Sequence, residues 1–461
     1  MSLKKGITVI LGANILNLVF QLLTNFLLPM FLSVDCYAEI KTFQMYASYA
    51  GVLHLGYVDG MYIKYGGKLL ETIDVKDLRS DLRTHASFQF ILCIIFLSIA
   101  FFVKDFTLVA FALVLLPLNV STYCQFLFQA TGEFQNYARV TNFTTILTFV
   151  ANIILLLLRY VTEYRIFLVS YVFVDFLLMF LVLTMLQRKK GVCFPFGGDM
   201  FSPDYLIANV SSGVFLMLGN FASIILTGMD RWFIKILMNN TAFAMYSFAV
   251  SMENMMNVAV TPVSTTLYNY FCCHKEYSEL RNIKGKIILF ASAIVACAFP
   301  AKFILETFLT KYLDSTSVIF YLFGAQIFYI IVKCFYVNLY KAQKRQKEYF
   351  AKLIAVIVIG FIFNAGFYAI LHTKEAFAIG TMLCGVTWYI LSELDFKTLR
   401  SNWKENMFLL LAALSYLFLG AVSEALIGLV LYAVLLVLLS LLLMRKDVVD
   451  CWKMAKGFLA R

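Results

Sequence analysis

The chain contains little charge for its length. Only 14% of its 461 residues are Asp, Glu, Lys or Arg, whereas 62% are hydrophobic. A typical soluble domain carries about 25% charged residues. The composition therefore excludes a soluble globular protein and predicts an all-α integral membrane protein with many spans.

Groups that bind metals or form disulfides are also scarce. None of the ten cysteines forms a C-x-x-C pair, and the adjacent Cys272 and Cys273 lie near a predicted cytoplasmic end of a span, where disulfides are unexpected. The four histidines lie far apart in the chain: His54, His85, His274 and His372. We expect no metal and no other cofactor.

Long polar segments are missing as well. The longest connections have about twenty residues, whereas small unaided domains need about 40. A soluble catalytic domain is therefore excluded. A polytopic glycan polymerase, ligase or glycosyltransferase would need acidic or metal-binding groups in sizeable outer loops. The outer loops here are short and contain no D-x-D pair.

The sequence contains fourteen apolar stretches that are long enough to cross a bilayer. They are residues 7–31, 38–62, 85–103, 106–129, 138–158, 166–186, 207–229, 243–268, 287–309, 318–339, 349–371, 376–394, 407–422 and 425–444. Of the 38 Lys and Arg residues, 28 fall in the segments on one side of these stretches and nine on the other. This bias predicts that both termini are cytoplasmic, and it accounts for the net charge of +11 without nucleic-acid binding.

The widest central gap between spans, residues 187–206, predicts the domain organisation. It contains Arg188, Lys189 and Lys190 and several Pro and Gly residues. We expect an N-terminal six-helix bundle at 1–187, a cytoplasmic linker at 188–206, a second six-helix bundle at 207–398, and two additional helices with a tail at 399–461. Because six is an even number, the two bundles would form a parallel repeat.

Polar residues recur on one side of the predicted helix after residue 206. Asn209 and Ser212 lie on this side, and the stripe continues through Asn220, Ser223, Thr227 and Arg231. The first span has a stripe made of Asn14, Asn17, Gln21 and Asn25. Adding 206 to these four numbers gives Asn220, Ser223, Thr227 and Arg231. Two polar faces at equivalent places predict one cavity shared by the two halves. The alternative is polar contact between packed helices.

Ionisable residues inside spans are costly and therefore indicate function. Asp59, Asp175, Glu253 and Lys333 lie inside predicted spans, and Asn257 lies close to Glu253. One hypothesis is an aqueous cavity in which Arg231 and Lys333 attract an anionic substrate, while Asp59, Asp175 or Glu253 carries a coupling proton. The alternative is that these charges pair with one another in a packed bundle.

Three stretches carry a family resemblance: VDCYAEIKTFQMYAS at 34–48, LGYVDGMYIKYGGK at 55–68 and TGMDRWFIKILMNNTAFAMYSFA at 227–249. With the number and spacing of the spans, they resemble the polysaccharide (O-antigen or capsule repeat-unit) flippases of the multidrug/oligosaccharidyl-lipid/polysaccharide exporter superfamily. The resemblance implies two bundles around a central cavity with alternating access, in a bacterial cytoplasmic (inner) membrane.

The resemblance also implies a substrate and partners. The substrate would be an undecaprenyl-diphosphate-linked oligosaccharide, moved from the cytoplasmic to the outer leaflet. Membrane lipids would surround the protein, and the polysaccharide polymerase and chain-length machinery are candidate partners. The related lipid II flippases carry several arginines in their first two spans, and this chain has none there. That difference disfavours lipid II itself.

Two further functions stay open beside the flippase and the enzyme. A multidrug or small-cation antiporter of the same superfamily would favour the acidic residues Asp59, Asp175 and Glu253, whereas Arg231 and Lys333 favour an anionic glycolipid. A structural assembly factor would tolerate neutralisation of Lys333 or Glu253.

Overall fold

The structure is a computed structural model that describes the backbone of residues 3–192, 201–273 and 276–459. The side chains of residues 3–15, 269, 273 and 454–459 lie outside this description. Every secondary-structure element in the described part of the chain is a helix. The all-α fold class predicted from the composition is confirmed.

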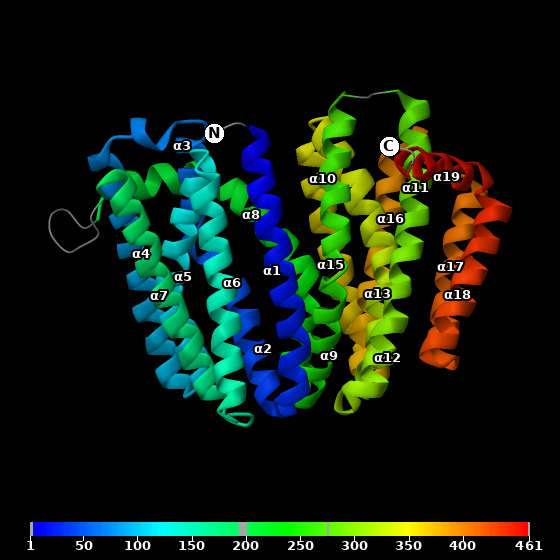
Figure 1. The fold of residues 1–461 in the computed structure, drawn as a ribbon, viewed down its shortest axis with the longest axis horizontal. Helices are drawn as coiled ribbons and strands as arrows, with labels where there is room; N and C mark the ends of the chain where they lie inside the picture. The colour runs from blue at the N-terminus through cyan, green and yellow to red at the C-terminus, as the bar shows by residue number, and fades with distance from the viewer. Residues whose placement is uncertain (1–2, 193–200, 274–275, 460–461) are drawn as a thin grey trace. The chain divides into compact units, whose positions relative to one another are not determined.

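The chain divides into two compact units, residues 1–224 and 225–461. Unit 1 contains seven helices and the first part of an eighth (Figure 1). They are α1 (Leu3–Phe31), α2 (Val34–Ser48), α3 (Tyr57–Tyr65), α4 (Val75–Val103), α5 (Phe106–Ala130), α6 (Phe134–Leu157), α7 (Tyr164–Lys190) and α8 (Pro203–Leu237). The helix α5 is central, because it packs against α2, α3, α4, α6 and α7, while α1 packs against α6.

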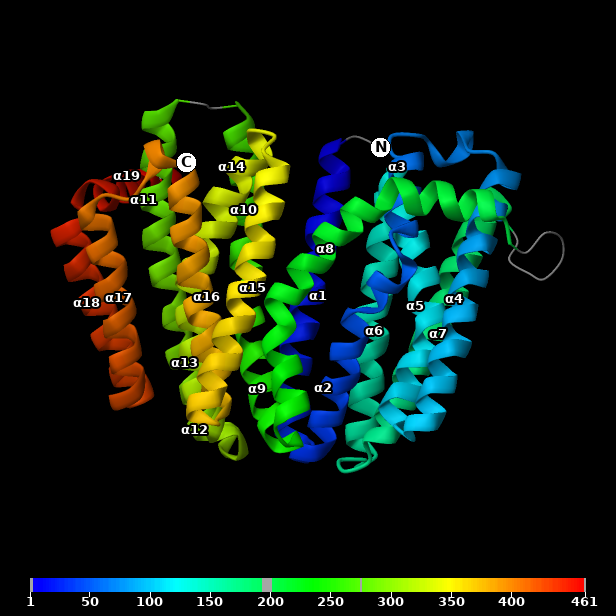
Figure 2. The ribbon, with the colours of Figure 1, turned by 180° about the vertical axis from the view of Figure 1, so that it is seen from behind.

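Unit 2 contains the rest of α8 and the remaining helices (Figure 2). They are α9 (Asn240–Asn254), α10 (Asn257–Cys273), α11 (Tyr277–Ile294), α12 (Ala298–Phe308), α13 (Thr316–Ile331), α14 (Val337–Ala342), α15 (Gln346–Leu371), α16 (Lys374–Asp395), α17 (Trp403–Val422), α18 (Ala425–Leu443) and α19 (Arg445–Leu459). Here α13 is central and packs against α9, α11, α16 and α17.

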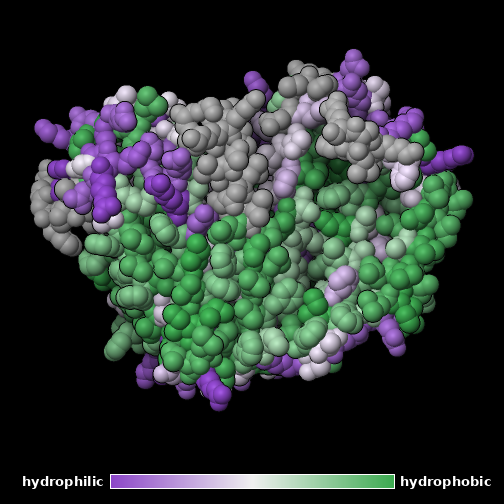
Figure 3. Space-filling view, viewed as in Figure 1, coloured by the Kyte–Doolittle hydropathy of each residue, from purple (hydrophilic) through white to green (hydrophobic). Residues whose placement is uncertain are grey.

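Helix length and composition match a multi-pass membrane protein. Eleven helical segments of the described chain are long and apolar enough to cross a membrane, and α1 adds the apolar stretch Leu16–Phe31. Figure 3 shows apolar residues covering the middle of the helices, with hydrophilic residues gathered at their ends. This distribution is the one expected for helices surrounded by lipid.

Two of the fourteen predicted spans are interrupted by turns in the structure. The predicted span 38–62 is divided into α2, a short 3₁₀ helix (Ala50–His54) and α3, and the predicted span 243–268 is divided into α9 and α10. At the first break, Leu55 and Gly56 both adopt positive φ angles, of 51° and 83°. The Asn119 side-chain amide donates to the Ala50 carbonyl at 3.2 Å, which compensates a backbone group freed by the break. Both breaks lie inside stretches that the sequence predicts as single spans, so overall hydropathy did not reveal them.

The offset of 206 residues recurs in the helix boundaries. Helix α2, Val34–Ser48, shifted by 206 coincides with α9, Asn240–Asn254, and the end of α1 at Phe31 coincides with the end of α8 at Leu237. The caps also match, because the Ser33 and Asn239 side chains each accept a hydrogen bond from the backbone three residues on. The internal repeat predicted from the polar stripes is therefore present in the helix geometry.

The connection between α7 and α8 is shorter than the linker expected from the sequence. Helix α7 continues to Lys190 and α8 begins at Pro203, so the connection covers residues 191–202 instead of the expected 188–206. The boundary between the two units falls later, inside α8. The reason is local packing, because Gly213 of α8 lies directly against the backbone of Gly56 and Gly60. The first part of α8 thus belongs to unit 1.

Candidate functional site

The predicted polar stripe on the unit 1 part of α8 contacts α3 and α4. The buried Asn209 donates from Nδ2 to Oδ1 of Asp81 at 2.9 Å, and Asn220 donates from Nδ2 to Oδ1 of Asp59 at 3.5 Å. The Ser223 hydroxyl donates to the Gly219 carbonyl at 3.2 Å. The side chains of Asn220, Ser223 and Thr227 are exposed.

The stripe on α1 is only partly described. The Asn14 side chain lies outside the described residues, whereas Gln21 is exposed and Asn25 is half-buried. Asn17 is buried, and its Oδ1 has no hydrogen-bond partner among the described atoms. A buried acceptor without a partner is unfavourable unless water or a ligand supplies a donor. Asn17 is thus the residue of this stripe that would gain most from a hydrogen-bond donor supplied by water or a ligand.

The two acidic residues predicted inside unit 1 lie in different surroundings. Asp59 is buried in the first turn of α3, where Asn220 donates to it. Asp175 is half-buried in the middle of α7, and no hydrogen bond to it is described among residues 16–453. The structure therefore joins Asp59 to the polar stripe, but it does not join Asp175 to it.

Charged residues of unit 2 gather where α9 ends. Glu253 lies in the last turn of α9 and accepts a hydrogen bond from Nε2 of Gln326. Its carboxylate interacts electrostatically with Asp230, Arg231 and Lys333. The structure thus brings three predicted site residues, Arg231, Glu253 and Lys333, into one group. We call Asp230, Arg231, Glu253 and Lys333 the charged cluster.

Helix α8 positions the first two members of this cluster. Asp230 is buried, accepts from the Tyr246 hydroxyl at 2.6 Å and lies 3.4 Å from the Thr381 hydroxyl. Arg231 is half-buried, and its Nε has no hydrogen-bond partner among the described atoms. An arginine donor without a partner in a spanning helix is suited to an anionic ligand.

A local distortion of the helix after α13 presents Lys333. Residues Val332–Tyr336 form a π-helical turn, a form that is rare and frequently found at functional sites. The Lys333 carbonyl accepts from the Ser264 hydroxyl at 3.3 Å, which ties the turn to α10. Asn257 begins α10 and donates to Asn254 at 3.3 Å. The break between α9 and α10 and the π-helical turn therefore both lie at the charged cluster.

The charged cluster has no counterpart in unit 1. Subtracting 206 places Asp230 on Thr24, Arg231 on Asn25 and Glu253 on Ala47. Helix boundaries and polar faces thus match between the two copies, whereas Asp230, Arg231 and Glu253 have no charged residue at the matching positions.

Asp81, which the sequence did not single out, joins three helices of unit 1. It is fully buried in α4 and accepts from the Tyr57 hydroxyl at 2.6 Å and the Tyr65 hydroxyl at 3.0 Å, besides Asn209. Lys64 forms an ion pair with it at 2.8 Å. Lys64 lies five residues after Asp59 in the sequence, but its partner in the structure is Asp81. The signal was the pair Leu78 and Leu82, both buried, which extends the helical pattern of α4 beyond the predicted span.

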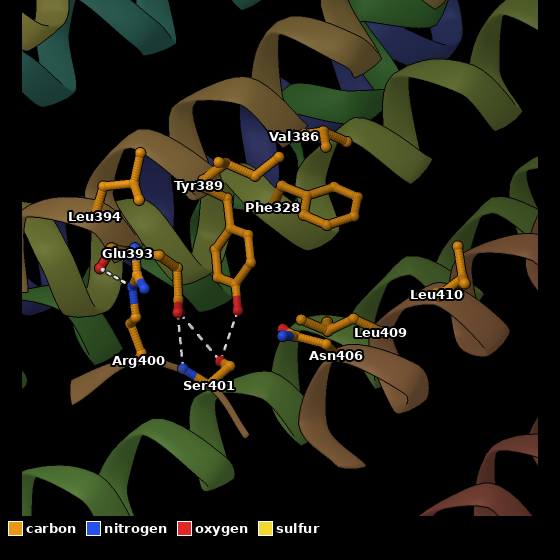
Figure 4. Close-up of a pocket in the computed structure, with 11 residues that line it drawn as sticks. Phe328, Val386, Tyr389, Glu393, Leu394, Arg400, Ser401, Asn406, Leu409 and Leu410 are labelled. Atoms are coloured by element: carbon orange, nitrogen blue, oxygen red, sulfur yellow. Dashed lines mark hydrogen bonds between the residues drawn. The ribbon is translucent and has the colours of Figure 1, made fainter. Parts of the chain in front are cut away.

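A second missed group lies near the end of α16. Glu393 accepts from Nζ of the buried Lys284 at 2.5 Å, from the Tyr336 hydroxyl at 2.5 Å and from the Ser401 backbone at 2.7 Å. The group borders a cavity of about 530 Å³ between α13, α16 and α17. Figure 4 shows Glu393, Arg400 and Ser401 at one end of this cavity and the apolar Val386 and Leu410 at the other.

The described part of the chain contains neither a cluster of metal ligands nor a disulfide. No three His, Cys, Asp or Glu residues there are close enough to share a metal ion. The eight described cysteines are free thiols.

Comparison with solved structures identifies the fold of the chain. No protein-family model and no curated protein matches the chain. Among solved structures it is similar to "Lipid II flippase MurJ, inward closed conformation", with a TM-score of 0.65 and 12% identity, over 95% of this chain and 98% of that one. It also matches a MATE in the straight conformation, with a TM-score of 0.44 and 12% identity, over 86% of this chain and 96% of that one. An outward-facing MATE family transporter of the MOP superfamily gives a TM-score of 0.43 at 13% identity over the same shares. The protein is thus a multi-pass integral membrane protein with the fold of the lipid II flippase MurJ.

Proposed function

We propose that the protein is a flippase for undecaprenyl-diphosphate-linked oligosaccharide repeat units. It moves them from the cytoplasmic to the outer leaflet by alternating access, for the synthesis of a surface polysaccharide. The observation that carries the proposal is the position of Arg231 and Lys333 inside helices of unit 2, both interacting with Glu253. Cations are retained inside a membrane protein where they meet an anion, and a diphosphate is such an anion.

Glu253 would act as the counter-ion that the substrate replaces. Without substrate, its carboxylate balances Arg231 and Lys333. When a diphosphate enters, the two cations bind it, and a protonated Glu253 no longer competes. Asp59 and Asp175 are the other candidates for such a coupling proton. The exchange keeps the net charge inside the membrane low in both states, which limits the desolvation penalty.

The polar faces of α1 and α8 would bind the sugars. Amide and hydroxyl side chains both donate and accept hydrogen bonds, as sugar hydroxyls do. These residues are Asn14, Asn17, Gln21, Asn25, Asn220, Ser223 and Thr227, with Asn257 at the start of α10. The unpartnered Oδ1 of Asn17 is the acceptor that would gain most from a sugar donor.

The substrate of the similar structure, lipid II, fits this chain less well. The described parts of α1, α2 and α3 contain no arginine. The lysines of α2 and α3 are Lys41 and Lys64, and Lys64 is already paired with Asp81. The cations of unit 2 are therefore the better place for it.

The sidedness of the lipid-linked oligosaccharide tests the proposal. The protein is depleted in cells, and a membrane-impermeant sugar-modifying probe reports which leaflet holds the oligosaccharide. Accumulation on the cytoplasmic face with loss of surface polysaccharide is expected. Unchanged sidedness after full depletion would refute the flippase.

A multidrug or organic-cation antiporter is the second candidate. It is favoured by the carboxylates within helices, Asp59, Asp175, Asp230 and Glu253. The same depleted cells would then lose resistance to toxic cations while their surface polysaccharide stays intact. We expect no enzymatic activity from either candidate.

A further inference from the structure

The last helix, α19, runs across the ends of its neighbours. It begins at Arg445, and Met444 alone separates it from the end of α18 at Leu443. It packs against α11 and α18. Figures 1 and 2 both show α19 lying crosswise over the end of unit 2, while α17 and α18 run along it. A helix that turns sharply at the end of a span lies where the membrane surface would be.

Two exposed tryptophans mark this level. Trp452 of α19 is 63% exposed, and Trp403, the first residue of α17, is 70% exposed. Val449 lies one turn before Trp452 and is exposed as well. Tryptophan is enriched at membrane–water interfaces, where its ring lies among lipid headgroups. We infer that this face of α19 contacts lipid.

A cavity of about 340 Å³ opens between α11, the start of α17 and the junction of α18 with α19. Its polar lining includes Lys404, Arg445 and Lys446. Its apolar lining includes Leu442, which is 75% exposed and continues the lipid-facing surface of α18. The cavity thus joins a basic rim to an apolar wall that leads into the bilayer.

The acidic residues of the cavity leave most of this positive charge unbalanced. Glu405 pairs with Arg281 at 3.1 Å, so these two charges neutralise each other. Asp447 packs against Gly285 and is then the one acidic residue of the lining that faces the three basic residues. Lys404, Arg445 and Lys446 are exposed, and no ion pair is described for them in residues 16–453. The rim is therefore cationic.

We propose that this cavity binds the phosphate of an anionic glycerophospholipid, whose acyl chains follow Leu442 and α18. Clusters of Lys and Arg beside a span attract anionic lipids, and basic pockets between spans bind their headgroups. The apolar wall distinguishes this site from one for soluble phosphate. The site lies outside the charged cluster and does not depend on the transported substrate.

Native mass spectrometry of the full chain in detergent tests the proposal. Phosphatidylglycerol is titrated against phosphatidylcholine for the wild type, for K404Q/R445Q/K446Q and for the control K341Q/K347Q/K397Q. The control removes the same charge from exposed lysines of unit 2 away from the cavity. We expect the wild type and the control to retain phosphatidylglycerol in preference, and the cavity variant to bind it about tenfold less tightly.

Two further results complete the test. Inorganic phosphate at millimolar concentration should not displace the lipid. Brominated phosphatidylglycerol should quench the fluorescence of Trp452, which is the part of the signal that the W452F variant lacks. Displacement by inorganic phosphate would make the site one for a soluble anion and overturn the lipid assignment. Equal binding by the cavity variant and the control would overturn the site itself. Matching melting temperatures of the three proteins ensure that lost binding is not lost folding.

Discussion

At the scale of single residues, Asp81 has the largest number of described charged and hydroxyl partners in unit 1. We expect D81A to lower the free energy of unfolding by about 3 kcal/mol, because removing one member of a buried pair leaves the other groups unsatisfied. Unfolding in detergent by a chemical denaturant measures this loss.

The control for D81A is D77A, on the same helix. Asp77 is exposed and, among the residues that the structure describes, accepts one side-chain hydrogen bond, from the Tyr205 hydroxyl at 2.9 Å. Its loss should change the stability by less than about 1 kcal/mol. Equal effects of the two substitutions would mean that Asp81 does not hold α3, α4 and α8 together.

The charged cluster allows a test that separates substrate binding from internal pairing. The double variant E253Q/K333Q keeps the net charge of the cluster unchanged, so we expect it to accumulate in the membrane like the wild type. Transport should nevertheless fall about tenfold or more, because a cation that binds the diphosphate is gone. The amount of surface polysaccharide in complemented cells measures transport.

The control for this pair is K374Q/E375Q, which removes an ion pair at 3.4 Å outside the cluster. It should transport normally. If E253Q/K333Q also transports normally, these charges serve only to balance each other.

The sequence predicted some of these residues and missed others for a physical reason. Arg231, Glu253 and Lys333 could be found because a charge inside an apolar run is conspicuous in one dimension. Asp81 and Glu393 could not, since they lie at or beyond the ends of predicted spans, where acidic residues are ordinary. Their burial depends on Lys64 and Lys284, which lie 17 and 109 residues away.

At the scale of helices, the close approach of α3 and α8 depends on glycine. A Cβ on Gly213 would overlap the backbone of Gly56 and Gly60, whereas one on Gly219 meets nothing within 4 Å. We expect G213A to destabilise the protein by about 1–3 kcal/mol, because the two helices must separate. G219A should be neutral or stabilise by up to about 1 kcal/mol, since alanine favours a helix.

Melting temperatures of these two variants in detergent decide the matter. A G213A protein as stable as G219A would show that α3 and α8 tolerate a wider separation than the structure has.

Helix boundaries were predictable where a polar residue or a cap interrupts the apolar run. The two-residue connections around Ser33 and Asn239 are such places. The break before α3 was not predictable in this way, whereas Asn254 and Asn257 flank the break before α10. At the first break, the stabilising group is Asn119 on another helix, far away in the sequence.

At the scale of the whole molecule, the distribution of Lys and Arg predicts the orientation in the membrane. Cys272 is exposed near the end of α10 on the predicted inner side, and Glu424 is exposed between α17 and α18 on the opposite side. In intact cells or spheroplasts, a membrane-impermeant maleimide should label E424C but reach Cys272 only after permeabilisation. The variant C272S identifies the native signal, and the reverse labelling pattern would contradict the orientation.

The fold itself could be predicted well from the sequence. Composition predicted a multi-pass α-helical protein, and the offset of the polar stripes predicted the repeat. The offset could not predict which charged residues lie together. Their partners include residues of α13 and α16, which lie outside the stretches that the offset relates.

The equal lengths of α2 and α9 have a consequence for insertions and deletions. Both helices have fifteen residues and follow the preceding helix after a two-residue connection, although their side chains differ at most positions. Adding or removing one residue would rotate everything after it by about 100° and move the helix break away from its partners. A scan of both helices should therefore find many tolerated substitutions and almost no tolerated changes in length.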